Sequence, residues 1–308
     1  MHFLKDDDLT PRQQRELLDL AAAVKQPDWN RRSLVQDGIP RSVAVIFEKP
    51  STRTRLSFQV GIAELGGNPV VVDSQATQLG RGESIADTAR VLSRYVHAIV
   101  VRTFADSRLA ELADHATVPV VNALTDGWHP CQLLADLQTI AEHRPLEGTA
   151  VAYVGDAAFN MGNSTVIACS LAGMHVRIGA PAGYQPARAV LDQAEAINRT
   201  TGGSVTVTDD PVEAVSGADV ISTDVWTSMG MEDREQRLAD LGPYQVNSEL
   251  VSHAADDAIV LHCLPAHRGE EITDEVIDGP HSRVFDQAEN RLHAQKALLA
   301  WLLGGDRR

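Results

Sequence analysis

The chain carries Phe47-Glu48-Lys49-Pro50-Ser51-Thr52-Arg53-Thr54-Arg55 between a short apolar run and a helical pattern. The run at 43–47 is typical of a buried strand, and the apolar residues of 56–65 recur at helical spacing. Pro50 interrupts the strand, and Ser51 or Thr52 can cap the helix that follows. Two hydroxyls and two guanidiniums thus lie where free backbone N–H groups and the helix dipole favour an anion. The stretch predicts a phosphate-binding turn that lacks the glycines of a P-loop.

Short apolar runs alternate with helical patterns along most of the chain, which indicates βαβ units and parallel sheets. The runs lie at 43–47, 69–73, 98–101, 118–121, 150–154, 175–178, 205–207, 220–222 and 259–261. A length of 308 residues suits two domains. We therefore expect an α/β protein with two doubly wound domains, each with a central parallel sheet flanked by helices.

A polar stop at Arg144-Pro145-Leu146-Glu147-Gly148 predicts the domain boundary. The first domain would cover residues 1–145 and the second 146–288. The last helix, within 289–308, would pack back on the first domain.

The composition excludes several classes of protein. A net charge of −15 argues against nucleic acid and anionic membranes as partners, because both require a basic face. Apolar runs stay well short of the roughly 20 residues of a membrane span. Three cysteines are too few for a disulfide framework, and the acidic N-terminus does not resemble a presequence. We expect a soluble cytoplasmic protein.

Polar clusters follow the predicted strands repeatedly, and ligands of open parallel sheets bind beyond the carboxyl ends of their strands. The clusters are 51–55, Arg102-Thr103, 129–132, 156–160, Asp224 and 262–265. Their recurrence at equivalent strand ends predicts an active site in the cleft between the two domains.

The first-domain clusters suit an anion with a carbonyl group. Arg53, Arg55 and Arg102 offer forks of donors that match phosphate or carboxylate oxygens, although each alone could be a solvated surface arginine. His129 can donate to a carbonyl oxygen and Gln132 can bind an amide-like group. The alternative for His129 is a structural cap at a helix start.

The second-domain clusters suit an amine. Asp224 could bind a substrate ammonium or simply cap, and Cys263 could bracket an amine with it. Asn160 is placed to bind a small polar ligand. The polar stretch from Ser228 to Gly242 reads as a lid loop or as an ordinary surface excursion.

Several other sites are disfavoured. Gly155, Ala157 and Phe159 do not form G-x-G-x-x-G, so the sequence disfavours a nicotinamide dinucleotide site here. His262-Cys263-Leu264-Pro265-Ala266-His267 lacks the second Cys/His pair of a zinc motif and the elbow of a thiol protease. We expect no metal and no organic cofactor.

At these residues the sequence resembles the aspartate/ornithine carbamoyltransferase superfamily, and within it the ornithine carbamoyltransferases, from about Phe3 to the C-terminus. Ser51-Thr52-Arg53-Thr54-Arg55 and His129-Pro130-Cys131-Gln132 match elements shared by the superfamily. Asp224 with Ser228-Met229-Gly230, and His262-Cys263-Leu264-Pro265, look like the ornithine signatures. Family members often carry two asparagines where this chain has Phe159-Asn160.

The resemblance implies transfer of a carbamoyl group from carbamoyl phosphate to the δ-amine of L-ornithine, giving citrulline and phosphate in arginine biosynthesis or a urea-cycle-type step. The implied carbamoyl-phosphate ligands are Ser51, Thr52, Arg53, Thr54, Arg102, His129, Gln132 and Arg291, joined by Gln78 reaching a neighbouring site in a homotrimer. The implied ornithine ligands are Asn160, Asp224, Ser228, Met229, Cys263 and Leu264. The implied catalytic residues are Thr54, Arg102, His129, Asp224 and Cys263.

Three alternatives remain. The acceptor could be aspartate, acetylated ornithine or putrescine, although Asp224 suits an amine better than the second carboxylate of aspartate. The chain could be a non-catalytic anion-binding subunit, which the presence of Arg53, His129 and Cys263 disfavours. A nicotinamide-dependent dehydrogenase is the third alternative.

Overall fold

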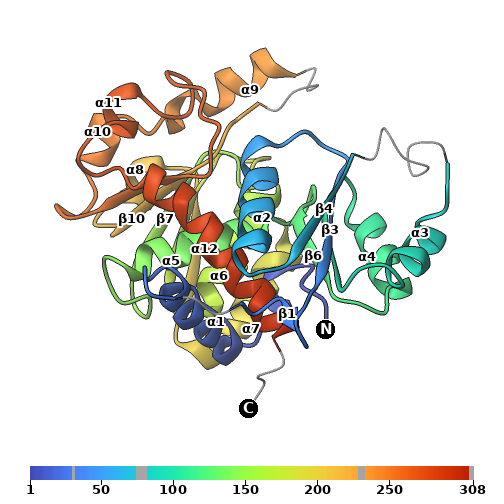
Figure 1. The fold of residues 1–308 in the computed structure, drawn as a ribbon. Helices are drawn as coiled ribbons and strands as arrows, with labels where there is room; N and C mark the ends of the chain where they lie inside the picture. Colours follow the sequence, from blue (N-terminus) through green and yellow to red (C-terminus); the bar gives the residue numbers. More distant parts are fainter. Residues whose placement is uncertain (30–31, 74–81, 228–232, 305–308) are drawn as a thin grey trace. The chain divides into compact units, whose positions relative to one another are not determined.

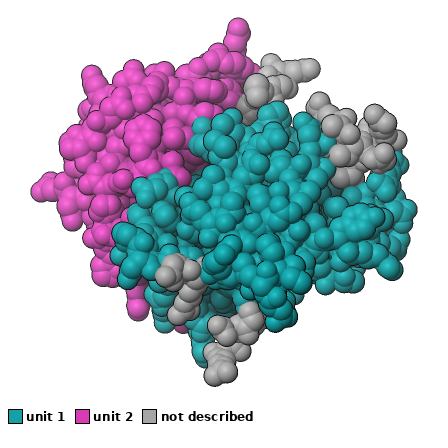
Figure 2. All heavy atoms as spheres, in the orientation of Figure 1, with its two compact units in different colours: residues 1–138, 289–308 teal, residues 139–288 magenta. Residues whose placement is uncertain are grey.

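A computed structural model describes residues 1–29, 32–73, 82–227 and 233–304. The chain forms two compact units, which Figure 2 shows in different colours. Unit 1 consists of Met1–Gln138 and Glu289–Arg308, and unit 2 of Thr139–Ala288. Both divisions fall within helices, whereas the sequence placed the first one in the polar stop near residue 145.

Unit 1 is built on a parallel sheet of four strands in the order β4-β3-β5-β6. The strands are β3 (Ser42–Phe47), β4 (Asn68–Asp73), β5 (Ala98–Arg102) and β6 (Val120–Leu124). Five consecutive residues of β3 are buried, as expected for a strand covered on both faces. The chain order reverses between β3 and β5, so ligands are expected beyond the carboxyl ends of these two strands.

The helices of unit 1 bury apolar faces against this sheet and against one another. They are α1 (Pro11–Val24), α2 (Thr52–Glu64), α3 (Ile85–Leu92), α4 (Asp106–His115), most of α5 (Pro130–Ala141) and most of α12 (Val284–Leu303), with the 3-10 turn η1 (Asp6–Asp8). Leu17, Val45, Phe58 and Leu298 belong to one buried cluster, which joins α1, β3, α2 and α12. Figure 1 shows α12, in red, running beside α2.

The last helix begins earlier than expected, at Val284 instead of Glu289, and it ends at Leu303. The Ser282 hydroxyl accepts a hydrogen bond from the Val284 N–H at 3.4 Å in the turn that leads into the helix.

Unit 2 has a parallel sheet of five strands in the order β11-β10-β7-β8-β9. The strands are β7 (Ala150–Val154), β8 (His175–Gly179), β9 (Ser204–Thr208), β10 (Val220–Thr223) and β11 (Ile259–His262). Here the chain order reverses between β7 and β10. The confirmed fold class is therefore α/β, with a parallel sheet flanked by helices in each unit.

The helices of unit 2 are α6 (Asn160–Leu171), α7 (Arg188–Thr201), α8 (Pro211–Val215), α9 (Arg234–Leu241), α10 (Ser248–Val251) and α11 (Asp274–Ile277), with the 3-10 turn η4 (Gly242–Tyr244). The expectation of a loop up to Gly242 is wrong for α9. This helix is polar in composition and buries only Arg237 and Leu241, so its apolar periodicity is weak.

The remaining regular structure is a small antiparallel hairpin, β1 (Val35–Gln36) and β2 (Ile39–Pro40). Within the described ranges, no helix combines the length and the apolar character that a bilayer crossing requires.

Candidate active site

The turn between β3 and α2 presents polar groups at a helix start. The Ser51 side chain caps α2 by accepting from the Thr54 N–H at 3.3 Å, as the sequence predicted. Thr52 and Arg53 are exposed, whereas Thr54 is buried. A pocket of about 450 Å³ adjoins the turn, lined among others by Ser51, Thr52 and Arg55. The turn is therefore open to a ligand on one side and fixed to the protein on the other.

Arg291 joins this turn to two other helices of unit 1. From α12 its guanidinium donates to the Thr54 hydroxyl at 3.1 Å and to the Gln132 side-chain oxygen on α5. The Gln132 amide group in turn donates to Asp136 at 2.7 Å. Each of these four side chains is at most 4% exposed, so their positions are set by mutual hydrogen bonds.

His129 lies at the start of α5 and is buried. Its pKa lies well below the ordinary value, because burial removes solvent from the charged form and the Arg291 and Arg102 guanidiniums repel it. The imidazole is therefore neutral near pH 7 and can donate one hydrogen bond. Arg102 ends β5 beside it and is partly buried.

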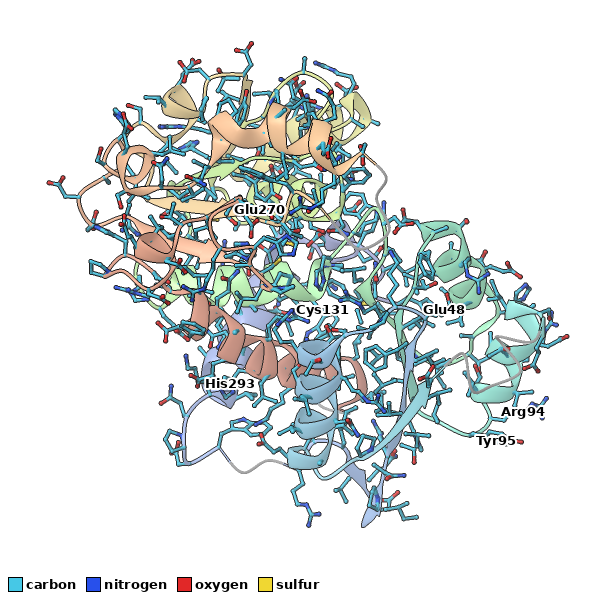
Figure 3. The ribbon with its side chains drawn as sticks, turned by 90° about the horizontal axis from the view of Figure 1, so that it is seen from above. Glu48, Arg94, Tyr95, Cys131, Glu270 and His293 are labelled. Atoms are coloured by element: carbon cyan, nitrogen blue, oxygen red, sulfur yellow. The ribbon has the colours of Figure 1, made fainter. Side chains whose placement is uncertain are left out.

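Glu48, labelled in Figure 3, supports the unit 1 group through hydrogen bonds that the sequence did not reveal. Its carboxylate accepts from Arg108 on α4 at 2.9 Å and from the Thr103 hydroxyl after β5. Its N–H donates to the Arg102 carbonyl at 2.9 Å. Glu48 therefore links the start of the turn between β3 and α2 to the segment that carries Arg102.

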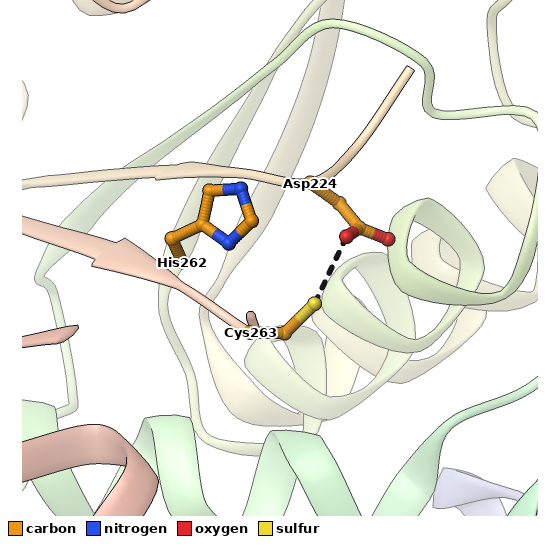
Figure 4. A group of neighbouring side chains, drawn as sticks. All are labelled: Asp224, His262 and Cys263. Carbon is orange, nitrogen blue, oxygen red and sulfur yellow. Dashed lines mark hydrogen bonds between the residues drawn. The ribbon is translucent and has the colours of Figure 1, made fainter. Parts of the chain in front are cut away.

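In unit 2, Asp224 and Cys263 meet at the ends of two neighbouring strands. Thr223 of β10 pairs with His262 of β11, so the residues that follow lie opposite each other. The Cys263 thiol donates to Asp224 Oδ1 across 2.9 Å (Figure 4). The Val225 N–H donates to the same oxygen at 2.7 Å. Both side chains are only partly buried, so a ligand can reach them.

His262 fixes the turn that carries Cys263 and Leu264. Its Nδ1 accepts from the Leu264 N–H at 2.9 Å, so its proton is on Nε2, which lies 2.9 Å from Glu271 Oε1. Leu264 has φ of 54°, an unusual left-handed conformation for this residue type. Asp224, His262 and Cys263 are close enough to hold a metal ion, yet both ring nitrogens of His262 are already hydrogen-bonded.

Asn160 is the first residue of α6 and follows a turn that begins at Asp156. Asp156 accepts from the Ala158 N–H at 3.1 Å and from the guanidinium of Arg237. Its pKa is raised, because desolvation by burial outweighs these two favourable interactions. Phe159, where family members often have asparagine, is 46% exposed.

The predicted site residues thus form two groups, one in each unit. Ser51, Thr52, Arg53, Thr54, Arg102, His129, Gln132 and Arg291 lie in unit 1, and Asn160, Asp224, Cys263 and Leu264 lie in unit 2. The predicted residues Gln78, Ser228 and Met229 lie outside the described residues. Sequence reasoning missed Glu48, Asp136 and Arg237. Only Asp136 had a signal, since it lies four residues after Gln132 on one helix face.

Two family models cover almost the whole chain. One, described as the carbamoyl-P binding domain of aspartate/ornithine carbamoyltransferase, matches residues 1–142. The other, described as the Asp/Orn binding domain, matches residues 147–302. The chain belongs to the aspartate/ornithine carbamoyltransferase family. The resemblance seen in the sequence is confirmed.

Individual members of this family match at full length. The chain is 60% identical over 304 residues to the ornithine carbamoyltransferase of Clavibacter sepedonicus, covering 98% of each chain. It is 58% identical over the same length to that of Mycolicibacterium gilvum, again covering 98% of each. The solved structure of the Pyrococcus furiosus ornithine carbamoyltransferase superposes with a TM-score of 0.94 at 48% identity, covering 99% of this chain and 98% of that one.

Proposed function

We propose that this carbamoyltransferase transfers the carbamoyl group of carbamoyl phosphate to the δ-amine of L-ornithine, giving L-citrulline and phosphate. The observation that carries the choice of acceptor is the pairing of Asp224 with Cys263. A carboxylate at this strand end attracts a cationic amino group, whereas an aspartate acceptor would call for additional cations there.

The unit 1 group would bind the donor. Ser51, Thr52 and Arg53 would bind the phosphate at the start of α2, where unpaired N–H groups and the helix dipole favour an anion. Thr54, Arg102 and His129 would donate to the carbonyl oxygen. Gln132 and Arg291, already hydrogen-bonded to each other, would fix the carbamoyl end.

The reaction would proceed by direct attack of the amine on the carbonyl carbon. As the N–C bond forms, negative charge develops on the carbonyl oxygen, where one donor is typically worth roughly 3–4 kcal/mol. The C–O bond to phosphate then breaks, and the departing phosphate takes the proton that the amine loses. Arg53 and Arg291 would stabilise the charge of the leaving group.

The unit 2 group would bind and orient the acceptor. An amine with a lysine-like pKa of about 10.4 costs about 4.6 kcal/mol to deprotonate at pH 7. Asn160, Asp224, Ser228 and Met229 would bind ornithine, and Cys263 and Leu264 would adjoin its side-chain amine. Orientation by these groups would offset part of the deprotonation cost, because the amine loses its freedom before attack.

The test is citrulline-type product formation from carbamoyl phosphate with ornithine, acetylornithine, putrescine and aspartate, each at equal concentration. Ornithine is expected to give the highest kcat/KM by a wide margin. Product with putrescine but not ornithine would replace the proposed acceptor, and no product with any amine would favour a non-catalytic anion-binding subunit.

We also propose a homotrimer in the cytoplasm, in which Gln78 reaches the donor site of a neighbouring copy. Leu56 and Val60 on α2 and Val70 on the edge strand β4 are exposed apolar side chains, as expected for a face that another copy covers. The three cysteines are free thiols, which suits a reducing compartment. Light scattering after size exclusion would give three times the chain mass of 33.3 kDa if the assembly is right.

A further inference from the structure

Arg237 of α9 is a buried arginine that the proposed reaction does not use. Its side chain is 6% exposed, and that of its ion-pair partner Asp156 is 7% exposed. Its Nε donates to the Trp226 carbonyl at 2.6 Å, and its Nη2 donates to Asp156. The other oxygen of Asp156 accepts from the Ala158 N–H at 3.1 Å. One guanidinium thus joins the segment after β10 to the turn after β7.

The same two segments also contact each other directly. Gly155 has φ of 116°, and a Cβ placed on it would lie 2.8 Å from the Trp226 indole nitrogen. The close approach therefore requires glycine at this position. The Thr223 hydroxyl also donates to the Val154 carbonyl at 2.7 Å. The Trp226 ring and the Thr223 hydroxyl thus bring the two segments together, and the hydrogen bonds of Arg237 add a second link between them.

Two aromatic rings complete the surroundings of this arginine. The guanidinium carbon lies 5.1 Å from the ring centre of Tyr184 and 5.9 Å from that of Phe159. The Tyr184 hydroxyl donates to Asp240, also on α9, at 2.9 Å. Phe159 directly precedes Asn160, so the cation also contacts the residue next to a proposed substrate ligand.

Such a buried ion pair is a weak source of net stability, because the cost of desolvating two charges offsets their attraction. What the planar fork of arginine supplies is geometry, since it donates in fixed directions to two separate acceptors. The segments it joins carry Asn160, two residues after Ala158, and Asp224, two residues before Trp226.

We propose that Arg237 is a positioning residue for the amino-acid acceptor, which fixes the turn carrying Asn160 against the segment carrying Asp224. This inference rests on the proposed function, in which both residues bind ornithine. Arg237 itself touches no reacting atom. Its loss would misplace Asn160 and Asp224 by a small distance. The unit 1 residues that are proposed to bind carbamoyl phosphate would stay unchanged.

The experiment compares the KM for ornithine with the dissociation constant for carbamoyl phosphate in Arg237→Lys, which keeps the charge but loses the fork. Asp156→Asn is the second variant, because it keeps the side-chain shape and removes the charge partner. Arg188→Lys is the matched control, since Arg188 is an exposed arginine of unit 2 in an ion pair with Asp192. Circular dichroism and thermal unfolding establish that each variant is folded.

We expect the KM for ornithine to rise at least about tenfold in both variants, because misplacing binding groups by a fraction of an ångström weakens productive binding. The dissociation constant for carbamoyl phosphate and both constants of Arg188→Lys should stay within about twofold of the unmodified chain. A merely structural role would lower the unfolding temperature without this split.

An unchanged KM for ornithine in the folded variants would overturn the inference, as would an equal weakening of carbamoyl-phosphate binding. If Arg237→Lys does not fold, Asp156→Asn decides alone. Failure of the proposed function is separately visible, because the unmodified chain would then give no citrulline.

Discussion

The two units present opposite chemistry at equivalent places in their sheets. In unit 1 the polar group is cationic, and the turn after β3 together with α2, β5, α5 and α12 contributes to it. Its buried members are Thr54, His129, Gln132 and Arg291. In unit 2 a carboxylate and a thiol lie half-buried at the ends of the adjacent strands β10 and β11. The unit 1 group lies where the strand order reverses, between β3 and β5. In unit 2 the order reverses between β7 and β10, so Asp224 lies at the reversal and Cys263 follows the next strand, β11. The topology therefore fixes the place of each polar group, and the charge of each group matches the substrate proposed for it.

The two groups also differ in how firmly the protein holds their side chains. The Arg291 guanidinium is hydrogen-bonded to both Gln132 and Thr54, so other protein groups already fix the positions of these three side chains. Preorganised donors stabilise developing charge without the cost of reorientation during the reaction. The Asp224 and Cys263 side chains are only partly buried and lie in the turns that follow β10 and β11, so their geometry depends on those turns. Substitutions in the unit 1 group should therefore affect carbamoyl phosphate, and substitutions in the unit 2 group should affect ornithine. The size of the effect should also differ between the two groups.

The largest effect is expected from Arg53→Ala. In the proposed donor site Arg53 contacts the phosphate, so its removal takes away charge-assisted hydrogen bonds, and turnover should fall on the order of 10²–10³-fold or more. The fold should survive, because Arg53 is exposed. Citrulline formation with saturating ornithine measures the loss, and Arg12→Ala on the exposed face of α1 is the charge-matched control. Near-normal turnover in the Arg53 variant would remove this residue from the donor site.

Asp224→Asn should act on the other substrate. The amide keeps the size of the side chain but no longer attracts an ammonium, so kcat/KM for ornithine should fall about 10²-fold. Asp192→Asn on the exposed face of α7 provides the control. An equal loss of carbamoyl-phosphate binding would show that the two groups do not divide the substrates.

The depressed pKa of His129 predicts a pH-dependent stability difference. Below about pH 6.5 the unfolded chain protonates this histidine, whereas the folded chain, with its lowered pKa, does not. Stability from this group is therefore complete above pH 6.5 and declines as the pH falls. The loss between pH 7.5 and 5.5 should be at most about 1.4 kcal/mol, the value reached when the folded chain takes up no proton at this histidine.

His129→Gln removes this titration, so the variant should lose less stability on acidification than the unmodified chain. Urea unfolding of both chains at the two pH values, at one protein concentration, measures the difference. The other histidines are common to both chains and cancel. Equal pH dependence in the two chains would mean that His129 is protonated as readily when folded as when unfolded.

The smallest effect is expected from Cys263→Ser. The serine hydroxyl can still donate to Asp224. The thiol sulfur lies 2.9 Å from Asp224 Oδ1, and a hydroxyl oxygen prefers a shorter distance to its acceptor than a sulfur does. The KM for ornithine should rise only a few-fold, with carbamoyl-phosphate binding unchanged. A loss as large as that of Asp224→Asn would instead assign the thiol a direct chemical role.

The sequence revealed the parts of the molecule that depend on local pattern. The run at 43–47 and the Ser51 cap could be read from residue order, because strand burial and helix capping act over a few residues. The polar clusters at strand ends also indicated Asn160, Asp224 and Cys263, and the family motifs then added Ser228, Met229 and Leu264. Glu48 and Arg237 could not be found this way, since their partners lie 60 and 81 residues away and only folding brings them together. Helix α9 was missed because its buried face includes an arginine.

The central proposal is that the unit 1 group binds carbamoyl phosphate and the unit 2 group binds ornithine. Its most direct test is equilibrium binding of carbamoyl phosphate in the absence of ornithine. Isothermal titration would compare the unmodified chain, Arg53→Ala and Asp224→Asn. We expect the same dissociation constant for the unmodified chain and Asp224→Asn, and binding at least about tenfold weaker for Arg53→Ala. Weakened binding in Asp224→Asn, or unchanged binding in Arg53→Ala, would contradict this proposal.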